Sequence, residues 1–418
     1  MTGQIYSVEV HMRVLLTPYV VASHYYQMAG FAWACRAAGH EVRVAAQPDF
    51  LGVVLKSGML GVPVGGNYDA LAGGIDTLKK STALVGKVNV AAGEQLPPKV
   101  LKEIQANKLV PYVKLAEDMA EDLVSFARWW RPDIVISDSL TYAAPLAADT
   151  VGAPVVRFLW GLDIGWRVAL PGSGISADED PRARWPRELT DLYARYGAKP
   201  RSHIGIRSLD ICPPSLQFPG VPDRMPARYI CYNGAEVAPS WVLEPVERPR
   251  VCVTWGGMST AIAGNDAFFV PQILKALADC DVDVVVIITA ADRELLGDLP
   301  ERVRVAENLP LHLLLPSCAA IIHQGGASTM LTAASFGVPQ LIIAGLMDQF
   351  ANATQIAAVG AGVGINWADV TIEAIASGVA AILSEGVRHA AGGLREEIFA
   401  QPAPAETVAA LVALAAAA

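Results

Sequence analysis

Short hydrophobic runs alternate with helix-like stretches along the first half of the chain. The run 13–17 is followed by a stretch, 24–38, with apolar residues at helical spacing that ends at Gly39, and then by the run 41–45. A strand, a helix and a strand of these lengths predict a βαβ unit and hence a parallel sheet. Further buried runs begin at Ile134 and Val155.

The same alternation restarts in the second half of the chain. Between the hydrophobic runs 319–322 and 341–344, residues 330–336 have a helix-compatible composition that stops at Gly337. The pattern therefore predicts a second parallel sheet. Its strands are expected at residues 250–254, 284–289, 303–305, 319–322 and 341–344, with a further helix at 266–278.

A proline-rich stretch separates the two halves, which favours a linker between two domains. We expect an N-terminal domain over 1–235, a linker over 236–249 and a second domain over 250–400. Residues 401–418 are expected to form a terminal helix. Two α/β halves joined in this way imply a cleft between them, with ligands at the carboxyl ends of the strands.

The chain between the second and third strands is harder to interpret. Residues 52–74 are glycine-rich, and residues 77–93 show no clean period. Residues 99–128 suggest a long helix, or a pair of helices, broken near Pro111.

The clearest chemical signal follows the run 319–322. A strand, a glycine turn and a helix start direct unpaired backbone N–H groups and the positive end of a helix dipole at one point. The natural ligand there is an anion, most often a phosphate or diphosphate. The residues of this turn are His323, Gln324, Gly325, Gly326, Ala327, Ser328 and Thr329, and we expect His323 to add a ring donor.

A second polar pair follows the next strand. Asp348 and Gln349 lie just beyond the run 341–344, where a carboxylate and an amide can hydrogen-bond ligand hydroxyls. The alternative is a generic turn that binds nothing, but we see no packing reason for this pair.

Residues 323–353 together resemble the donor signature of glycosyltransferases that use nucleotide-activated sugars to modify small molecules. The segment from Ser23 to Ala45 resembles the N-terminal signature of macrolide and polyketide glycosyltransferases from antibiotic pathways. This resemblance implies a GT-B fold, in which two Rossmann-like domains with parallel sheets face each other across a cleft. It also implies inverting transfer of a deoxysugar from a donor linked to thymidine diphosphate (dTDP) to a polyketide acceptor.

The resemblance assigns roles to two residues at the rim of the first predicted sheet. His24 matches the histidine that serves as general base, and Asp138 could orient it. Two alternatives stay open. His24 could cap the helix or contact a ligand without moving a proton, and Asp138 could be the N-cap of a helix that begins near Tyr142.

The remaining site residues also follow from the resemblance. Asn308 stands where an apolar or aromatic residue is expected beside the nucleotide base. We expect Tyr25, Trp160 and Trp166 to contact an apolar acceptor. Besides the turn at 323–329, Asp348 and Gln349, the expected donor-binding residues are Gly256, Gly257, Ser259, Asn308 and Leu309.

Composition narrows the class of protein further. The chain has 418 residues, of which 53% are hydrophobic, but it contains no apolar stretch of about 18 residues and no secretory signal pattern. The net charge of -9 without a basic block argues against nucleic acid as a partner. Six widely spaced cysteines suggest free thiols in a reducing cytoplasm. We expect no metal and no cofactor.

Some alternatives remain at the level of sequence. The same two-domain shape is used by sugar-nucleotide 2-epimerases, and a catalytically silent helper or a C-glycosyltransferase acting on an aromatic polyketide would also fit. In the resembled family some members need a helper protein that resembles a cytochrome P450. The sequence leaves such a helper, and a homodimer, open.

Overall fold

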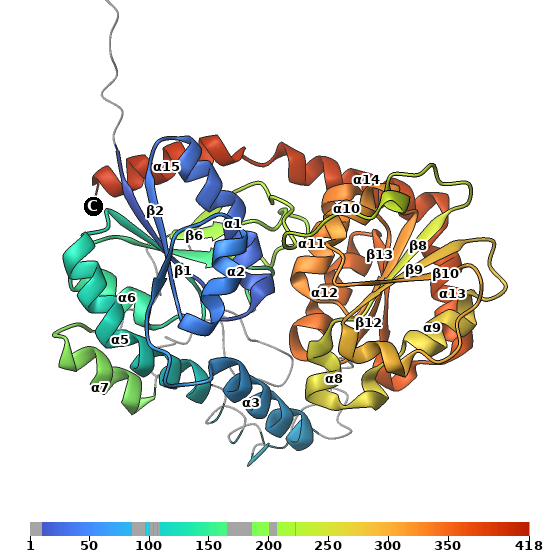
Figure 1. The fold of residues 1–418 in the computed structure, drawn as a ribbon, viewed down its shortest axis with the longest axis horizontal. Helices are drawn as coiled ribbons and strands as arrows, with labels where there is room; N and C mark the ends of the chain where they lie inside the picture. The colour runs from blue at the N-terminus through green and yellow to red at the C-terminus, as the bar shows by residue number, and fades with distance from the viewer. Residues whose placement is uncertain are drawn as a thin grey trace, which may run out of the picture.

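Two parallel sheets, each covered by helices, form two lobes (Figure 1). The computed structural model describes residues 11–85, 109–164, 186–199, 207–221 and 223–417, together with positions 97, 99, 100, 103 and 107. Each sheet lies in one half of the chain, as the alternating pattern of hydrophobic runs predicts.

In the N-terminal lobe the described strands run in the order β3-β2-β1-β4-β5-β6-β7, all parallel. Every residue of β4 and β5 is buried, as expected of central strands covered on both faces. The order reverses between β1 and β4, which are neighbours. The strands are β1 (Arg13–Thr17), β2 (Glu41–Ala46), β3 (Gly61–Pro63), β4 (Ile134–Asp138), β5 (Val155–Leu159), β6 (Arg207–Asp210) and β7 (Arg224–Pro226).

The helices of this lobe show where the sequence pattern was weak. The helix α3 was not predicted, because Gly73 and Gly74 lie within it and glycine disfavours helix. Pro111 does not break a helix but lies in the first turn of α5, where its missing N–H has no cost. The helices are α1 (Ala22–Ala37), α2 (Leu51–Lys56), α3 (Ala70–Val85), α5 (Val110–Trp130), α6 (Ala143–Asp149) and α7 (Arg187–Arg195).

In the C-terminal lobe the described strands run in the order β10-β9-β8-β11-β12-β13, again all parallel. Here the order reverses between β8 and β11. The strands are β8 (Arg250–Thr254), β9 (Asp283–Ile288), β10 (Val303–Glu307), β11 (Ala320–His323), β12 (Gln340–Ala344) and β13 (Gly362–Asn366).

One helix of this lobe begins later than predicted. The expected helix over 266–278 is a short 3-10 turn, Asn265–Ala267, followed by α9, which has a proline in its first turn. The helices are α8 (Gly257–Ala263), α9 (Val270–Leu277), α10 (Leu311–Leu314), α11 (Ala327–Phe336), α12 (Met347–Ala358), α13 (Ile372–Ile382), α14 (Glu385–Ala400) and α15 (Pro404–Ala417). The other 3-10 turns are Pro48–Phe50, Ser240–Val242, Ala290–Leu295, Leu315–Ser317 and Trp367–Asp369.

The last helix crosses from one lobe to the other. In Figure 1, α14 lies on the C-terminal lobe, and α15 continues over the N-terminal lobe beside α1. Val408 and Leu411 of α15 join the core that contains β1 and α1. Just before α15, the carbonyl of Pro402 accepts the N–H of Arg228 at 2.9 Å. The chain end therefore ties the lobes together. The domain boundaries expected from the sequence stay a prediction.

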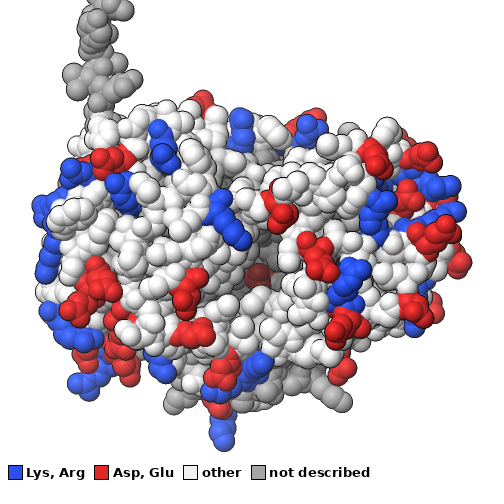
Figure 2. Space-filling view, in the orientation of Figure 1, with Lys and Arg blue, Asp and Glu red and all other residues white. Residues whose placement is uncertain are grey.

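The surface in view mixes both charges, and a hollow separates the lobes (Figure 2). Among the described residues, no single helix is long and apolar enough to cross a membrane. The pair α14 and α15, bent by 42°, reaches that length and hydropathy only when taken together. All six cysteines are free, and Cys35, Cys212 and Cys252 are buried.

Candidate active site

The predicted site residues gather where the strand order of each sheet reverses. His24 lies in α1, which follows β1, and Asp138 is the last residue of the neighbouring strand β4. In the other lobe, Gly256 follows β8, and the glycine turn follows the neighbouring strand β11. Open parallel sheets form ligand crevices at such points, because the connections on either side leave in opposite directions.

His24 and Asp138 form a hydrogen-bonded pair. The His24 Nδ1 lies 2.8 Å from the Asp138 Oδ2. The Asp138 side chain is fully buried, whereas 13% of the His24 side chain is exposed. The other carboxylate oxygen, Oδ1, accepts the backbone N–H of Leu140 at 2.8 Å. With the Nδ1 proton held by the carboxylate, the His24 Nε2 is left with a lone pair.

The N-cap alternative for Asp138 does not fit this geometry. The helix α6 begins at Ala143 with Tyr142 as its N-cap, and no side chain caps it. Asp138 therefore contacts His24 and the turn directly after β4 rather than the end of α6.

Aromatic rings surround His24. The Trp160 ring, just after β5, lies 4.4 Å from the imidazole between centroids, at an angle of 32°. The Tyr19 ring lies 5.7 Å from the imidazole, and Tyr112 of α5 lies 5.5 Å beyond Tyr19. Burial, and then the charge of Asp138, raises the pKa of Tyr19, so its phenol stays neutral. These rings form an apolar wall beside His24.

Tyr19 and Tyr112 were missed at the level of sequence. Tyr19 stands two residues after β1, at the carboxyl end of a predicted strand, and that position is a usable signal. Tyr112 carried no such sequence signal, because it reaches the site only through the packing of α5.

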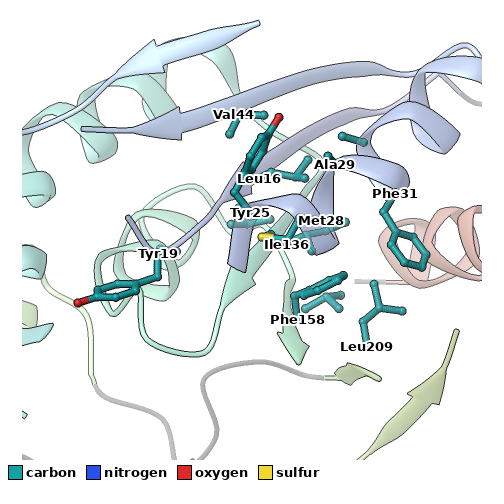
Figure 3. Packing of buried hydrophobic residues seen from close by; sticks show 14 of the residues in the cluster. Leu16, Tyr19, Tyr25, Met28, Ala29, Phe31, Val44, Ile136, Phe158 and Leu209 are labelled. Atoms are coloured by element: carbon teal, nitrogen blue, oxygen red, sulfur yellow. The ribbon is translucent and has the colours of Figure 1, made fainter. Parts of the chain in front are cut away.

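Tyr25 is not an acceptor contact, contrary to the sequence prediction. Its side chain is fully buried, and its hydroxyl lies 2.5 Å from the Ser57 Oγ. Burial raises its pKa to about 12. In Figure 3 it lies in the packed core with Leu16 and Val44. Successive helix residues point about 100° apart, so His24 faces the cleft while Tyr25 faces the sheet. Trp166 lies outside the described residues.

The glycine turn in the C-terminal lobe has the geometry of an anion site. Gly325 adopts a φ of +96°, and α11 begins at Ala327 with Gly326 as its N-cap. No side chain caps this helix, so its first N–H groups face outward unpaired. Ser328 and Thr329 are partly buried in the first turn. The turn therefore presents N–H groups and hydroxyls at one place.

His323 does not offer the ring donor expected from the sequence. Its ring is 1% exposed. The Nε2 lies 3.0 Å from the Gln340 Oε1, and the Nδ1 accepts the N–H of Gly325 at 3.0 Å. Burial lowers the pKa of His323 to about 4, so the ring is neutral at pH 7. His323 instead holds the glycine turn in shape.

Two glutamines hold the loops around this turn. Gln324 accepts the N–H of Gly256 at 2.8 Å, which joins the loop after β8 to the loop after β11. Gln349 accepts the N–H groups of Gly345 and Leu346 at 3.0 and 2.9 Å. The Gln349 Nε2 also lies 3.4 Å from the buried Oγ of Ser259. Gln349 therefore has a structural role that the sequence did not reveal, because it caps the start of α12.

Asp348 lies in the first turn of α12 and is partly buried. Burial raises the pKa of its carboxyl from 3.8 to about 6, and its own backbone N–H and the charge of His24 partly oppose this. The His24 side chain of the other lobe is therefore near enough to Asp348 to act on its carboxyl. Gly257 follows Gly256 and begins α8, on the same rim.

The backbone conformation explains why Asn308 stands where an apolar or aromatic residue was expected. Asn308 has a φ of +53° directly after β10, and asparagine tolerates this left-handed conformation better than an apolar residue. Its side chain is exposed. Leu309 is 4% exposed and packs into the core of the C-terminal lobe. Among the described residues, no three His, Cys, Asp or Glu side chains cluster as a metal site.

Two facing Rossmann-like lobes, with an uncapped helix end after a glycine turn on one and a histidine–carboxylate pair on the other, define a GT-B glycosyltransferase. The chain belongs to the erythromycin biosynthesis protein CIII-like family. The model of its N-terminal domain matches residues 33–256, and that of its C-terminal domain matches residues 271–414. The predictions of fold and of enzyme class are therefore confirmed.

Similar proteins cover nearly the whole chain. The 10-deoxymethynolide desosaminyltransferase of Streptomyces venezuelae is 39% identical over 97% of this chain and 97% of its own length. The tylactone mycaminosyltransferase of Streptomyces fradiae is 35% identical over 95% of this chain and 91% of its own length. The crystal structure of the glycosyltransferase VinC in complex with dTDP superposes with a TM-score of 0.78 at 34% identity, covering 97% of this chain and all of that one.

Proposed function

We propose that this enzyme transfers a deoxysugar from a dTDP-linked donor to a hydroxyl group of a macrolide or related polyketide, with inversion at the anomeric carbon. The observation that carries the proposal is the pair of His24 and Asp138, 2.8 Å apart, beside the segment Trp160–Gly161 that meets the start of α11. Relatives named for desosamine and mycaminose transfer, and a neighbour in complex with dTDP, support the choice of substrates.

The proposed reaction is a single displacement. The Nε2 of His24 takes the proton of the acceptor hydroxyl as its oxygen bonds to the anomeric carbon. The bond from that carbon to the diphosphate oxygen breaks on the opposite face, which inverts the configuration. Asp138 holds the Nδ1 proton and stabilises the imidazolium that forms. The apolar wall of Tyr19 and Trp160 suits a hydrophobic acceptor.

On the donor side, the N-terminus of α11 would receive the charge of the departing diphosphate. Its uncapped N–H groups and the hydroxyls of Ser328 and Thr329 are preorganised donors. In this scheme Asp348, at the start of α12, accepts hydrogen bonds from sugar hydroxyls. No metal ion or cofactor is needed in this scheme. A cytoplasmic location, a helper protein resembling a cytochrome P450 and a homodimer stay predictions.

The decisive experiment offers the enzyme a panel of dTDP-deoxysugars with macrolactones and aromatic polyketides, and identifies the products by mass spectrometry and NMR. We expect O-glycosides of inverted configuration. Replacing His24 by alanine is expected to lower kcat by about 100-fold or more, since general base catalysis contributes about 10²–10⁴. The matched control is H389A, because His389 is exposed on α14.

Two results would contradict the proposal. The first is near-normal O-glycoside formation by H24A. The second is isomerisation of the donor at C2 without any acceptor, which would favour a 2-epimerase instead. A C-glycoside as the main product would replace the hydroxyl acceptor by an aromatic carbon.

A further inference from the structure

A short segment after β5 touches both halves of the candidate site. The Trp160 ring lies 4.4 Å from the His24 ring. The next residue, Gly161, approaches Ala327 at the start of α11 so closely that a Cβ on Gly161 would lie 2.7 Å from the Cβ of Ala327. The segment Trp160–Asp163 is thus in contact with the proposed base and with the proposed donor helix.

A buried ion pair links the end of this segment to β5. Arg157 of β5 donates from Nη1 and Nη2 to the two carboxylate oxygens of Asp163, at 2.9 and 2.7 Å. The two side chains are only 7% and 3% exposed. The Arg157 Nε and Nη2 also contact the Ser208 Oγ, at 3.2 and 2.8 Å. A planar two-point contact of this kind fixes direction as well as distance.

A buried amide holds the same segment from the other side. The Gln217 Oε1 accepts the N–H of Asp163 at 2.9 Å. Its Nε2 donates to the Asp210 Oδ1 at 3.0 Å and to the carbonyl of Gly161 at 3.4 Å. The neighbouring carbonyl of Leu216 accepts the Gln355 Nε2 of α12 at 2.7 Å, which joins this anchor to the C-terminal lobe.

A buried ion pair is poor evidence for a stability role, because apolar residues of similar volume often stabilise a fold as well or better. Apolar packing would not, however, fix the orientation of the segment Trp160–Asp163 as the ion pair of Arg157 and Asp163 does.

We propose that Arg157, Asp163 and Gln217 are positioning residues, which hold Trp160 against His24 and Gly161 against α11 and so set the spacing between base and donor. This inference rests on the proposed role of His24. A displacement on the order of 1 Å at such a site can cost about 100-fold in rate.

The first test replaces the pair together, as R157M/D163L, so that no unpaired charge is left buried. The control is R187M/D191L, which makes the same exchange in an exposed ion pair on α7 of the same lobe. The second test is G161A, which leaves the ion pair intact and adds one methyl group against Ala327. The compensating G161A/A327G removes that clash again.

Each purified variant is assayed for kcat and KM, for the Kd of dTDP by calorimetry, and for its melting temperature. For R157M/D163L and G161A we expect kcat to fall at least about tenfold, while the Kd stays within about threefold. G161A/A327G is expected to regain part of the lost kcat, and R187M/D191L to keep all of it.

The inference is overturned if G161A and a folded R157M/D163L keep kcat within about threefold of the wild type. It is equally overturned if kcat and melting temperature fall while the Kd of dTDP rises in parallel, since that is the result of a purely structural role. If R157M/D163L does not fold, G161A and its compensating variant decide. Transfer by H24A would refute the proposed function, whereas inactive H24A beside fully active G161A would refute this inference alone.

Discussion

Replacing Asp138 by asparagine is the sharpest test of the proposed mechanism, because it exchanges one carboxylate oxygen for an NH2 group and removes the charge while hardly changing the volume. In the native protein the Asp138 Oδ1 accepts the N–H of Leu140 while Oδ2 faces the His24 Nδ1. The Leu140 N–H would fix the new amide with its oxygen in the same place. The NH2 group would then face His24 and donate to Nδ1, which moves the ring proton to Nε2.

The expected loss follows from two contributions. A hydrogen bond to a charged group is worth about 1.5–3 kcal/mol and a neutral one about 0.5–1.5, so the imidazolium loses about 1–1.5 kcal/mol. Restoring the reactive tautomer of His24 leaves two N–H groups facing each other, a further cost of about 1–3 kcal/mol. The sum of about 2–4.5 kcal/mol corresponds to a fall in kcat of about 30- to 2,000-fold.

The assay is steady-state transfer with a saturating donor and product detection by mass spectrometry. The matched control is D133N, since Asp133 also accepts a backbone N–H, from Arg13 at 2.7 Å, but lies at the opposite end of the sheet. Because paired groups act as a unit, H24A/D138N should be no slower than H24A. Folded D138N with kcat within about threefold of the wild type would refute the reasoning.

Two further predictions concern the C-terminal lobe. The pKa of Asp348 is raised to about 6, so the native carboxyl binds its proton more tightly than the unfolded chain, and its contribution to stability is lost as pH rises from about 4 to 6. On going from pH 4 to pH 7, the urea midpoint of D348N should therefore rise more, or fall less, than that of the wild type, and an identical change in both proteins would contradict this. In G325A, a φ of +96° and a Cβ 2.7 Å from Ile342 should cost about 1–3 kcal/mol of stability and weaken dTDP binding at least tenfold. G326A, with open space around the new Cβ, should keep the melting temperature, and a normal dTDP Kd in G325A would disprove the role of the turn.

Local sequence was enough to place the chemistry on the right elements. Hydrophobic runs and helix ends located β1, β4, β8, β11 and β12 to within a residue or two. Parallel strands put their carboxyl ends on one rim, so His24 and Asp138 could be expected on the same side of a sheet although 114 positions separate them.

Which way each side chain points was less accessible. Tyr25 was expected in the cleft and lies in the core, because its place on α1 turns it away from His24. His323 was expected to donate and instead has both ring nitrogens engaged, since Gln340 from the next strand meets it. Both errors concern residues whose type fits a ligand but whose environment is made by neighbouring elements.

The sequence by itself determined the two α/β halves, the glycine turn and the presence of a histidine and a carboxylate at strand ends, because each depends on contacts within a few residues. Only the tertiary structure decided that His24 pairs with Asp138, that Trp160 packs against His24 and that Gly161 meets Ala327. Those contacts depend on strand order and on the approach of two lobes, and neither is encoded in any local pattern.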